Sequence, residues 1–265
     1  MAGIVVALGE SVRQFVTYLG ALAHLGVSGF LRLAIPPHNL RAIVQHMDRI
    51  GVQSLPIALL TALFVGMVFA METAYGLQKF GADAMLGVGV ALAIVRELGP
   101  VMTSIMVGGR VGSGMTAELG AMRVAEQIDA MRALGADPVK MLVTPRLLAT
   151  LVVLPLLTIL ADVVGIAGGM LIAGAELHMS SRWFLAVVLQ TLTVGDVASG
   201  LAKALCFGGT IATVACYQGL QTTGGTEGVG RATTATVVVT ALLILASDFL
   251  LSKFFLVVFP PRVSL

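Results

Sequence analysis

The sequence predicts an all-α integral membrane protein with an N-terminal interfacial helix, five transmembrane helices, and a cytoplasmic helix between the second and third spans. Hydrophobic residues make up 57% of the 265 residues and charged residues only 11%, whereas a typical soluble domain carries about 25% charged residues. So few charges cannot cover a water-exposed surface. The sequence also contains several apolar stretches of about 20 residues, which is long enough to cross the hydrocarbon core of a membrane.

Five apolar stretches qualify as spans. The sequence places them at residues 55–75, 85–112, 147–175, 197–217 and 233–259. Residues 1–54 then form an N-terminal cytoplasmic or interfacial segment, and residues 55–259 form the membrane domain. The stretch 14–31 is uncharged but rich in polar residues and glycine, so we expect it to lie in the interface. The alternative is that it spans. Residues 183–195 are too short to cross and are expected at the opposite surface.

Basic residues are distributed unevenly between the two sides that five spans define. One side holds Arg13, Arg32, Arg41, Arg49, Arg110, Arg123, Arg132, Lys140, Arg146 and Arg231. The other side holds Lys79, Arg182 and Arg262. Because Lys and Arg concentrate in cytoplasmic segments, we expect a cytoplasmic N-terminus and a C-terminus on the outer side. The net charge of +2 is too small to indicate a nucleic-acid partner.

The long segment between the second and third spans is predicted to be helical over residues 116–134, because its residues are strong helix formers. On such a helix Glu118, Met122, Glu126 and Asp129 share one face, with Arg123 beside it. One interpretation is an amphipathic helix lying on the membrane. Anionic lipid head groups repel an acidic face, which favours the other interpretation, a helix that docks into a cytoplasmic partner.

A charged step interrupts the second span, where Arg96 and Glu97 stand in VRELGPVM. Charges at this depth are costly and usually face a cavity or a partner. Pro100 has no N–H to offer the Arg96 carbonyl, so we expect a kink and a free carbonyl oxygen there. Arg96 could then bind a phosphate or carboxylate head group. The alternative is an internal ion pair that fixes helix packing.

Asp162, Lys203 and Asp248 each stand alone in an apolar helix. A pair between Lys203 and one of the two aspartates is expected; a proton relay through all three is the alternative, and would suit an ion-coupled secondary transporter. Glycines in residues 108–114 and 165–169 have the spacing that allows close helix approach rather than phosphate binding.

Several chemistries are excluded by missing motifs. The sequence has no GxxxxGK[ST] motif, and the glycine-rich loop 224–234, with Glu227 and Arg231, has no P-loop lysine. HExxH is also missing, and the four histidines lack metal-ligand spacing. We therefore expect no catalytic residue, no metal and no cofactor in this chain, and the chain is not predicted to be an enzyme.

Two blocks resemble a known family. VRELGPVMTSIMVGGRVGSGMTAELGAMRVAEQIDAMRALGADPVKMLVTPRLLA and GGTEGVGRATTATVV are similar to the signature stretches of the MlaE (YrbE/Ttg2B) family of ABC transporter permeases, and the resemblance runs from about residue 55 to residue 255. It implies an inner-membrane protein that moves glycerophospholipids between the inner and outer membranes of a Gram-negative bacterium and so maintains outer-membrane lipid asymmetry. It also implies a periplasmic C-terminus.

The resemblance further implies partners and site residues. The permease would be a homodimer with a cytoplasmic MlaF-like ATPase that binds ATP and Mg²⁺, a MlaB-like STAS-domain protein, and a hexameric MlaD-like MCE-domain protein. Lipid would occupy a periplasm-facing cavity at the dimer centre. Its lining would include Arg96, Glu97, Leu98, Phe69, Tyr75 and Leu77. Residues 116–134 would be the coupling helix on the ATPase, and Glu227 and Arg231 would lie in a cytoplasmic loop.

Overall fold

The computed structural model describes residues 2–33 and 40–258, and in these ranges the chain is helical with no strand. The first elements are α1 (Ala2–Leu33), α2 (Leu40–Ile50), α3 (Leu55–Gln78), η1 (Asp83–Met85), α4 (Leu86–Ala93), η2 (Ile94–Leu98) and α5 (Gly99–Val107). Then come η3 (Gly108–Gly112), α6 (Ser113–Val124), α7 (Gln127–Ala133), η4 (Val139–Val143), α8 (Thr144–Glu176), α9 (Ser181–Thr191), α10 (Val194–Leu220) and α11 (Gly225–Val258). Three short elements, η2, η3 and η4, are π-helical turns.

Five helical segments of the described chain are long and apolar enough to cross a membrane, as the sequence predicted. They cover Leu40–Gln78, Asp83–Val124, Val139–Glu176, Val194–Leu220 and Gly225–Val258. Each exceeds the predicted span because the helices continue past the apolar stretch at one or both ends. Residue 259, the predicted end of the last span, lies outside the described residues.

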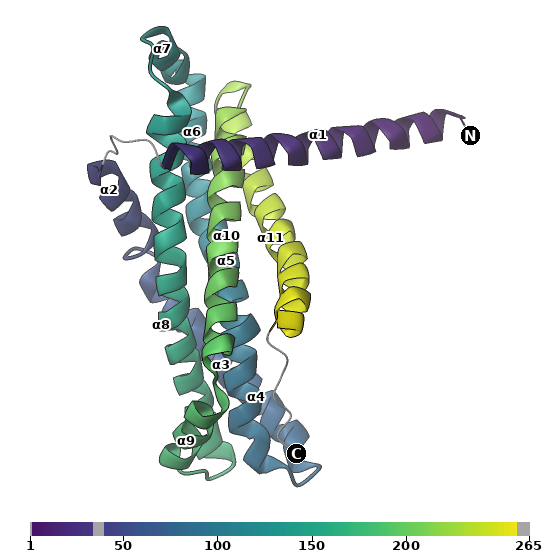
Figure 1. The fold of residues 1–265 in the computed structure, drawn as a ribbon, viewed down its shortest axis with the longest axis vertical. Helices are drawn as coiled ribbons and strands as arrows, with labels where there is room; N and C mark the ends of the chain where they lie inside the picture. The colour runs from purple at the N-terminus through teal and green to yellow at the C-terminus, as the bar shows by residue number, and fades with distance from the viewer. Residues whose placement is uncertain (1, 34–39, 259–265) are drawn as a thin grey trace.

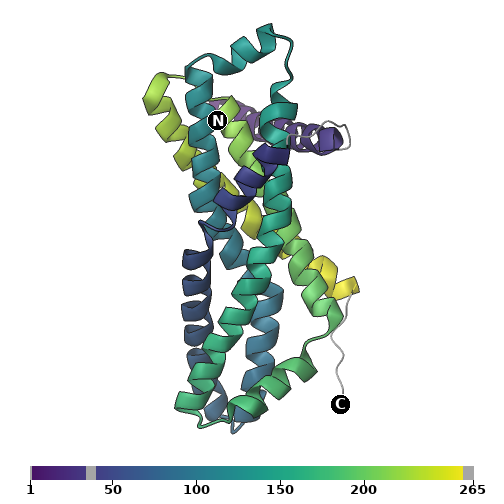
Figure 2. The ribbon, with the colours of Figure 1, turned by 90° about the vertical axis from the view of Figure 1, so that its left-hand side faces the viewer.

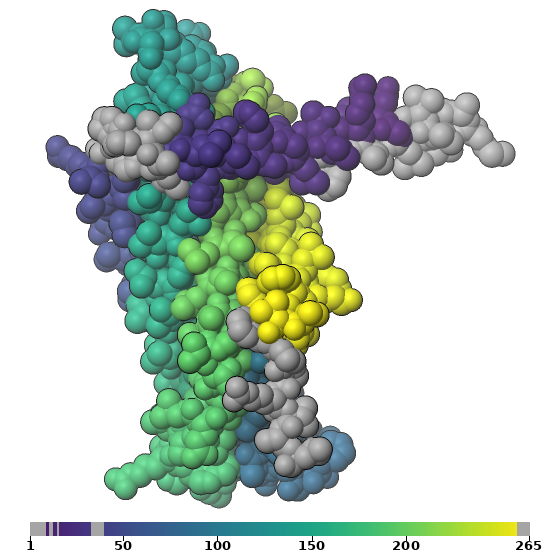
Figure 3. All heavy atoms as spheres, viewed as in Figure 1, coloured from purple at the N-terminus to yellow at the C-terminus, as the bar shows by residue number. Residues whose placement is uncertain are grey.

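The two shorter apolar segments lie at opposite ends of the bundle. Helix α1 lies across one end of the bundle, where it packs on α8, α10 and η4, and Figure 3 shows it extending well beyond the bundle. It is not among the candidate spans. Helix α9 lies at the opposite end, and α7 forms the tip of the end that α1 crosses (Figures 1 and 2).

Glycines bring α3 and α8 into direct backbone contact. A Cβ atom added to Gly66 would collide with the carbonyl oxygen of Gly165, and one added to Gly168 would collide with that of Leu63. In lipid no hydrophobic driving force brings helices together, so they associate through van der Waals packing, and small residues permit the close approach that this packing needs. The predicted packing role of residues 165–169 is confirmed. In the other glycine stretch, Gly108 packs near Thr240, whereas a Cβ at Gly109 would meet open space.

The predicted single helix over residues 116–134 is wrong. Helix α6 continues the second span to Val124, and the chain then turns at Glu126, whose φ of 56° is left-handed, before α7 begins. The buried residues Met115, Thr116 and Leu119 place α6 inside the bundle. Tertiary packing, rather than the helix propensity of the segment, therefore decides where the helix ends.

The predicted glycine-rich loop over residues 224–234 is also wrong beyond its first residue. Gly224 and Gly225 have φ of 86° and 68°, which turns the chain from α10 into α11. Gly228 then packs so closely on the Thr223 carbonyl that a Cβ would collide with it. Glu227 and Arg231 are exposed on the first turns of α11 instead of in a loop.

Candidate functional site

Lys203 is the centre of a charged network at membrane depth. Its ammonium group, on a side chain only 2% exposed, donates to Glu97 Oε2 over 2.6 Å and to Ser252 Oγ over 2.7 Å. It also forms an ion pair with Asp248 over 2.9 Å. Burying an ammonium group is tolerated only when its charge and donors are matched, so the network joins α10, η2 and α11. The predicted pairing of Lys203 with an aspartate is confirmed, and the partner is Asp248.

Arg96 belongs to the same region but faces another partner. Its guanidinium group is ion-paired with Asp196, and Nε donates to Asp196 Oδ1 over 2.5 Å. Asp196 is 2% exposed and also accepts hydrogen bonds from the backbone N–H and hydroxyl of Thr193, which completes a capping box at the start of α10. The internal ion pair considered for Arg96 is therefore present. Sequence reasoning missed Asp196, although Thr193 and Asp196 have capping-box spacing.

The network is open on one side. A small cavity of about 60 Å³ is lined by Arg96, Glu97, Lys203 and Ser252, among others. The Glu97 side chain is 43% exposed and that of Arg96 is 25% exposed. Basic and acidic side chains thus both reach a cavity within the spans, where they can bind a charged or strongly polar group.

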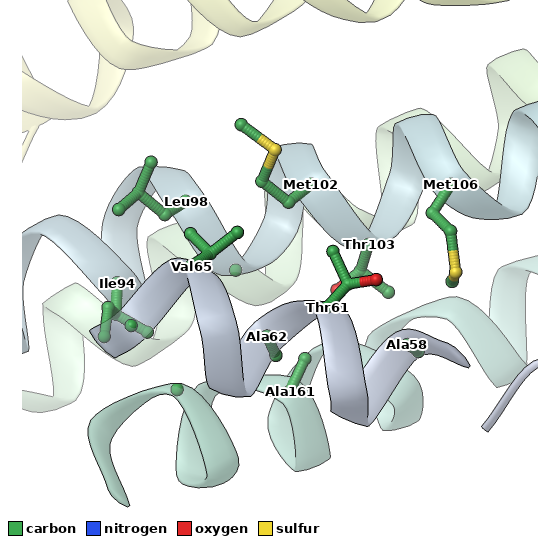
Figure 4. Close-up of a pocket in the computed structure, with 13 residues that line it drawn as sticks. Ala58, Thr61, Ala62, Val65, Ile94, Leu98, Met102, Thr103, Met106 and Ala161 are labelled. Carbon is green, nitrogen blue, oxygen red and sulfur yellow. The ribbon is translucent and has the colours of Figure 1, made fainter. Parts of the chain in front are cut away.

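An apolar pocket begins at the residue that follows Glu97. It lies between α3, η2, α5 and α8, and Figure 4 shows its lining. The labelled residues are Ala58, Thr61, Ala62, Val65, Ile94, Leu98, Met102, Thr103, Met106 and Ala161. Apart from Thr61 and Thr103 the lining is aliphatic or thioether, and the volume is about 20 Å³, so the pocket has room for only a small apolar group. The polar cavity and the apolar pocket share no lining residue, but both border the second span, at Glu97 and at Leu98 respectively.

The other residues that the family resemblance assigned to a cavity lie elsewhere on α3. Phe69 and Leu77 are partly buried against the core between α3, α4, α8 and α9. Tyr75 is 64% exposed, and the Lys79 ammonium lies 4.5 Å from the centre of its ring. None of the three lines the apolar pocket. Their place in a cavity between two copies of the chain stays a prediction.

The predicted acidic docking face is not a single face. Glu118 binds the buried Arg146 over 2.9 Å and lies 3.6 Å from Arg49. Met122 packs against the core near Leu119. The turn at Glu126 redirects the rest of the segment, and Asp129 instead pairs with Arg123 over 2.5 Å and with Arg132 over 3.2 Å. Glu126 itself is exposed.

Asp162 does not join Lys203 and Asp248. Its Oδ1 atom is buried with no hydrogen-bond partner among the described residues, and a Cβ at Gly99 would collide with that atom. The three ionisable residues therefore do not form the relay that an ion-coupled transporter would need. The described part of the chain also holds no group of three or more His, Cys, Asp or Glu residues placed to bind a metal.

A multi-pass helical bundle with a charged network at membrane depth is typical of the membrane subunit of a transporter. The chain belongs to the MlaE permease family, whose sequence profile matches residues 43–254. A probable ABC transporter permease protein of Rickettsia conorii is 37% identical over 249 residues, which cover 94% of this chain and 96% of that protein.

Two further relatives carry more specific names. The intermembrane phospholipid transport system permease protein MlaE of Haemophilus influenzae is 34% identical over 247 residues, 93% of this chain and 95% of that protein. The chloroplastic protein trigalactosyldiacylglycerol 1 of Arabidopsis thaliana is 41% identical over 225 residues, 85% of this chain and 64% of that protein.

Proposed function

We propose that this chain is the membrane-spanning permease subunit of an ABC transporter that moves glycerophospholipids between the inner and outer membranes of a Gram-negative bacterium. The observation that carries the proposal is that the second span borders both a charged cavity, lined by Glu97, and an apolar pocket, lined by Leu98. A phospholipid has the matching division into a charged head and hydrocarbon chains. The name of the Haemophilus relative, an intermembrane phospholipid transport permease, supports the same substrate class.

The charged network gives the head group its partners. Arg96 and Lys203 supply positive charge, but each is already paired with a carboxylate of the chain. Glu97 is the most exposed of the five charged groups, so we propose that it exchanges Lys203 for the head group as lipid enters. The complete lipid site would form between two copies of the chain in a homodimer, in a cavity open to the periplasm.

ATP and Mg²⁺ would be bound by a separate MlaF-like ATPase, because this chain has no P-loop. The end of α6 and α7, with Met122, Arg123, Glu126 and Asp129, would be its docking segment. A MlaB-like STAS-domain protein and a hexameric MlaD-like MCE-domain protein would complete the assembly. ATP binding would favour the state in which the lipid cavity is closed, and so expel lipid toward the MCE ring.

The proposed orientation places the end with α1 and α7 in the cytoplasm and α9 in the periplasm. Arg123 and Arg132 flank the α6–α7 turn at the first end, which agrees with the positive-inside rule. The chain would therefore have a cytoplasmic N-terminus and a periplasmic C-terminus in the inner membrane.

The pocket is tested by filling it. We expect Leu98→Trp to lower the amount of phospholipid that co-purifies with the full chain, measured by mass spectrometry, and to lower lipid transport in reconstituted vesicles. Leu160→Trp is the matched control, since Leu160 is 43% exposed on α8 and does not line the pocket. Equal lipid content in Leu98→Trp and the unchanged chain would contradict the proposal.

The transporter class is tested by its energy source. Mass spectrometry of co-purifying subunits should identify an ABC ATPase, and lipid movement should need ATP. The alternative, an ion-coupled secondary transporter that uses Asp162, Lys203 and Asp248, predicts transport with a proton gradient and no ATPase. That result would replace the ABC proposal.

A further inference from the structure

A third cavity lies nearer than the pocket of Figure 4 to the end of the bundle that α1 crosses. Met106 lines that pocket, and Arg110, four residues later, lines this cavity. It has a volume of about 520 Å³ and lies between α2 and the η3–α6 segment. Its polar lining comes from His46, Arg49, Gln53, Arg110 and Glu118. A Cβ added to Gly114, which also lines it, would meet no atom within 4 Å. The cavity is therefore spacious and polar at one wall.

The charges in this cavity do not balance. Arg110 donates to the neutral Ser54 hydroxyl over 2.7 Å, and among residues 2–33 and 40–258 no carboxylate forms an ion pair with it. Arg49 lies 3.6 Å from Glu118 Oε1. The other carboxylate oxygen, Glu118 Oε2, is held by the buried Arg146 over 2.9 Å. The cavity thus presents two guanidinium groups, and one carboxylate oxygen that is only loosely contacted.

An apolar surface leads away from the cavity along α3. Ile57, Leu60, Phe64 and Val68 are 48%, 55%, 55% and 54% exposed. They are 3, 4 and 4 residues apart, so they share one face of α3, which begins two residues after Gln53. A molecule with its head in the cavity could therefore lay a hydrocarbon chain along the membrane-spanning part of α3.

We propose that this cavity binds the head group of a zwitterionic aminophospholipid from the membrane leaflet at this end of the bundle. Arg49 and Arg110 would bind the phosphate as charge-assisted donors, and Glu118 Oε1 would accept a hydrogen bond from the ammonium group. The acyl chains would follow the exposed face of α3. This second lipid site is separate from the one at Glu97 and Leu98. If experiments show that the cavity binds no lipid, the proposed transport function is unaffected.

A free anion is a poorer match to this cavity. Glu118 would repel a phosphate ion that brought no positive group of its own. The rest of the lining includes the apolar side chains of Ile50, Val111 and Met115. A head group that carries both charges and a hydrocarbon chain uses all three features of the cavity.

The test is a lipid titration of the full chain, purified and delipidated in detergent, with bound lipid counted by native mass spectrometry. The probes are phosphatidylethanolamine, phosphatidylglycerol and soluble phosphoethanolamine. We expect the double variant Arg49→Gln/Arg110→Gln to weaken phosphatidylethanolamine binding roughly tenfold or more, the change expected when about 1.4 kcal/mol of binding free energy is lost. Repeating the titration in Leu98→Trp separates this site from the first.

Two control variants keep the fold and the helix but leave the cavity untouched. Arg41→Gln and Asp48→Asn change exposed charges of α2 that do not line the cavity, so phosphatidylethanolamine binding should stay within about twofold of that of the unchanged chain.

Two further variants test the cavity itself. Gln53→Trp fills the cavity without changing a charge and, like the double variant, should reduce binding. Glu118→Gln should remove the preference for phosphatidylethanolamine over phosphatidylglycerol.

Three results would overturn the proposal. Unchanged phosphatidylethanolamine binding in both the double variant and Gln53→Trp would show that the cavity holds no lipid head group. Competition by phosphoethanolamine as strong as that by the intact lipid would indicate a site for a soluble molecule that carries both charges, not for a lipid. A change of oligomeric state in Gln53→Trp, with lipid binding preserved, would identify the cavity as an interface between copies of the chain.

Discussion

The ammonium group of Lys203 donates a hydrogen bond to the main-chain carbonyl oxygen of Arg96 over 3.0 Å. In a regular helix this carbonyl would accept from the residue four positions later, which is Pro100 and has no N–H. The π-helical turn η2 ends at the same place, where Gly99 N–H bonds to the Ile94 carbonyl. A side chain of α10 thus satisfies a main-chain group that the second span cannot satisfy itself.

We predict that Lys203→Met destabilises the protein strongly. The substitution leaves Glu97 and Asp248 without their cation and the Arg96 carbonyl without a donor. Breaking a buried ion pair from one side costs about 3–5 kcal/mol. Thermal unfolding in detergent should therefore occur at a markedly lower temperature than for the unchanged chain.

A combined variant separates charge from packing in this network. Lys203→Met with Glu97→Gln and Asp248→Asn removes the uncompensated carboxylates, so it should recover part of the stability that the single variant loses. If the combined variant is as unstable as Lys203→Met alone, charge balance does not explain the stability. The hydrogen bond from Lys203 to the Arg96 carbonyl oxygen would then be the main stabilising contact of the network.

Sequence reasoning located this network better than it assigned its pairs. The freed carbonyl followed from Pro100 alone, since proline chemistry is local. The choice of Asp248 over Asp162 for Lys203 could not be made, because it depends on how each helix is rotated about its axis. Asp196 was missed for the same reason: it is 100 residues away from Arg96, and only their packing brings them together.

The fold itself was more predictable than the docking segment. Span number follows from apolar length, which the bilayer thickness fixes. The end of α6 does not follow from composition, because Ala125 and Glu126 are good helix formers yet the chain turns there. Burial of Leu119 on one side of the turn and exposure of Glu126 on the other are tertiary properties.

We predict that Gly66→Ala destabilises the α3–α8 contact by about 1–3 kcal/mol, the usual cost of overpacking. The new methyl group would collide with the Gly165 carbonyl oxygen, and a backbone atom cannot move aside as a side chain can. Gly76→Ala on the same helix is the control, because its Cβ meets nothing within 4 Å. Equal melting temperatures of the two variants would show that the helices can separate without cost.

We predict that acid loosens the attachment of α1. Arg32 Nε binds Asp137 Oδ2 over 2.6 Å. Partial burial raises the pKa of Asp137, but the hydrogen bonds from Arg32 and from the N–H groups of Lys140 and Val139 lower it more, so the pKa lies below its ordinary value. A depressed pKa stabilises the folded state above the unfolded pKa of about 3.9, and this stabilisation is lost as pH falls through the folded value.

Hydrogen exchange measures this acid effect. After correction for intrinsic rates, exchange near Arg32 and Val139 should be constant between about pH 5 and pH 8 and rise below about pH 4, near the ordinary pKa of an aspartate. Asp137→Asn should remove this pH dependence, whereas Asp129→Asn should not. A pH dependence that survives in Asp137→Asn would mean that another group controls the attachment of α1.

Two acidic residues that the sequence placed on one face of the docking segment, Glu118 and Glu126, have different surroundings in the structure. Glu126 is exposed at the turn between α6 and α7, so Glu126→Lys should change the free energy of unfolding by no more than about 0.5 kcal/mol. Glu118 supports the buried Arg146, so Glu118→Lys should destabilise the chain by about 3–5 kcal/mol. If the segment docks on an ATPase, Glu126→Lys should lose the co-purifying ATPase while its fold is intact. Retention of the ATPase by Glu126→Lys would move the docking surface away from this turn.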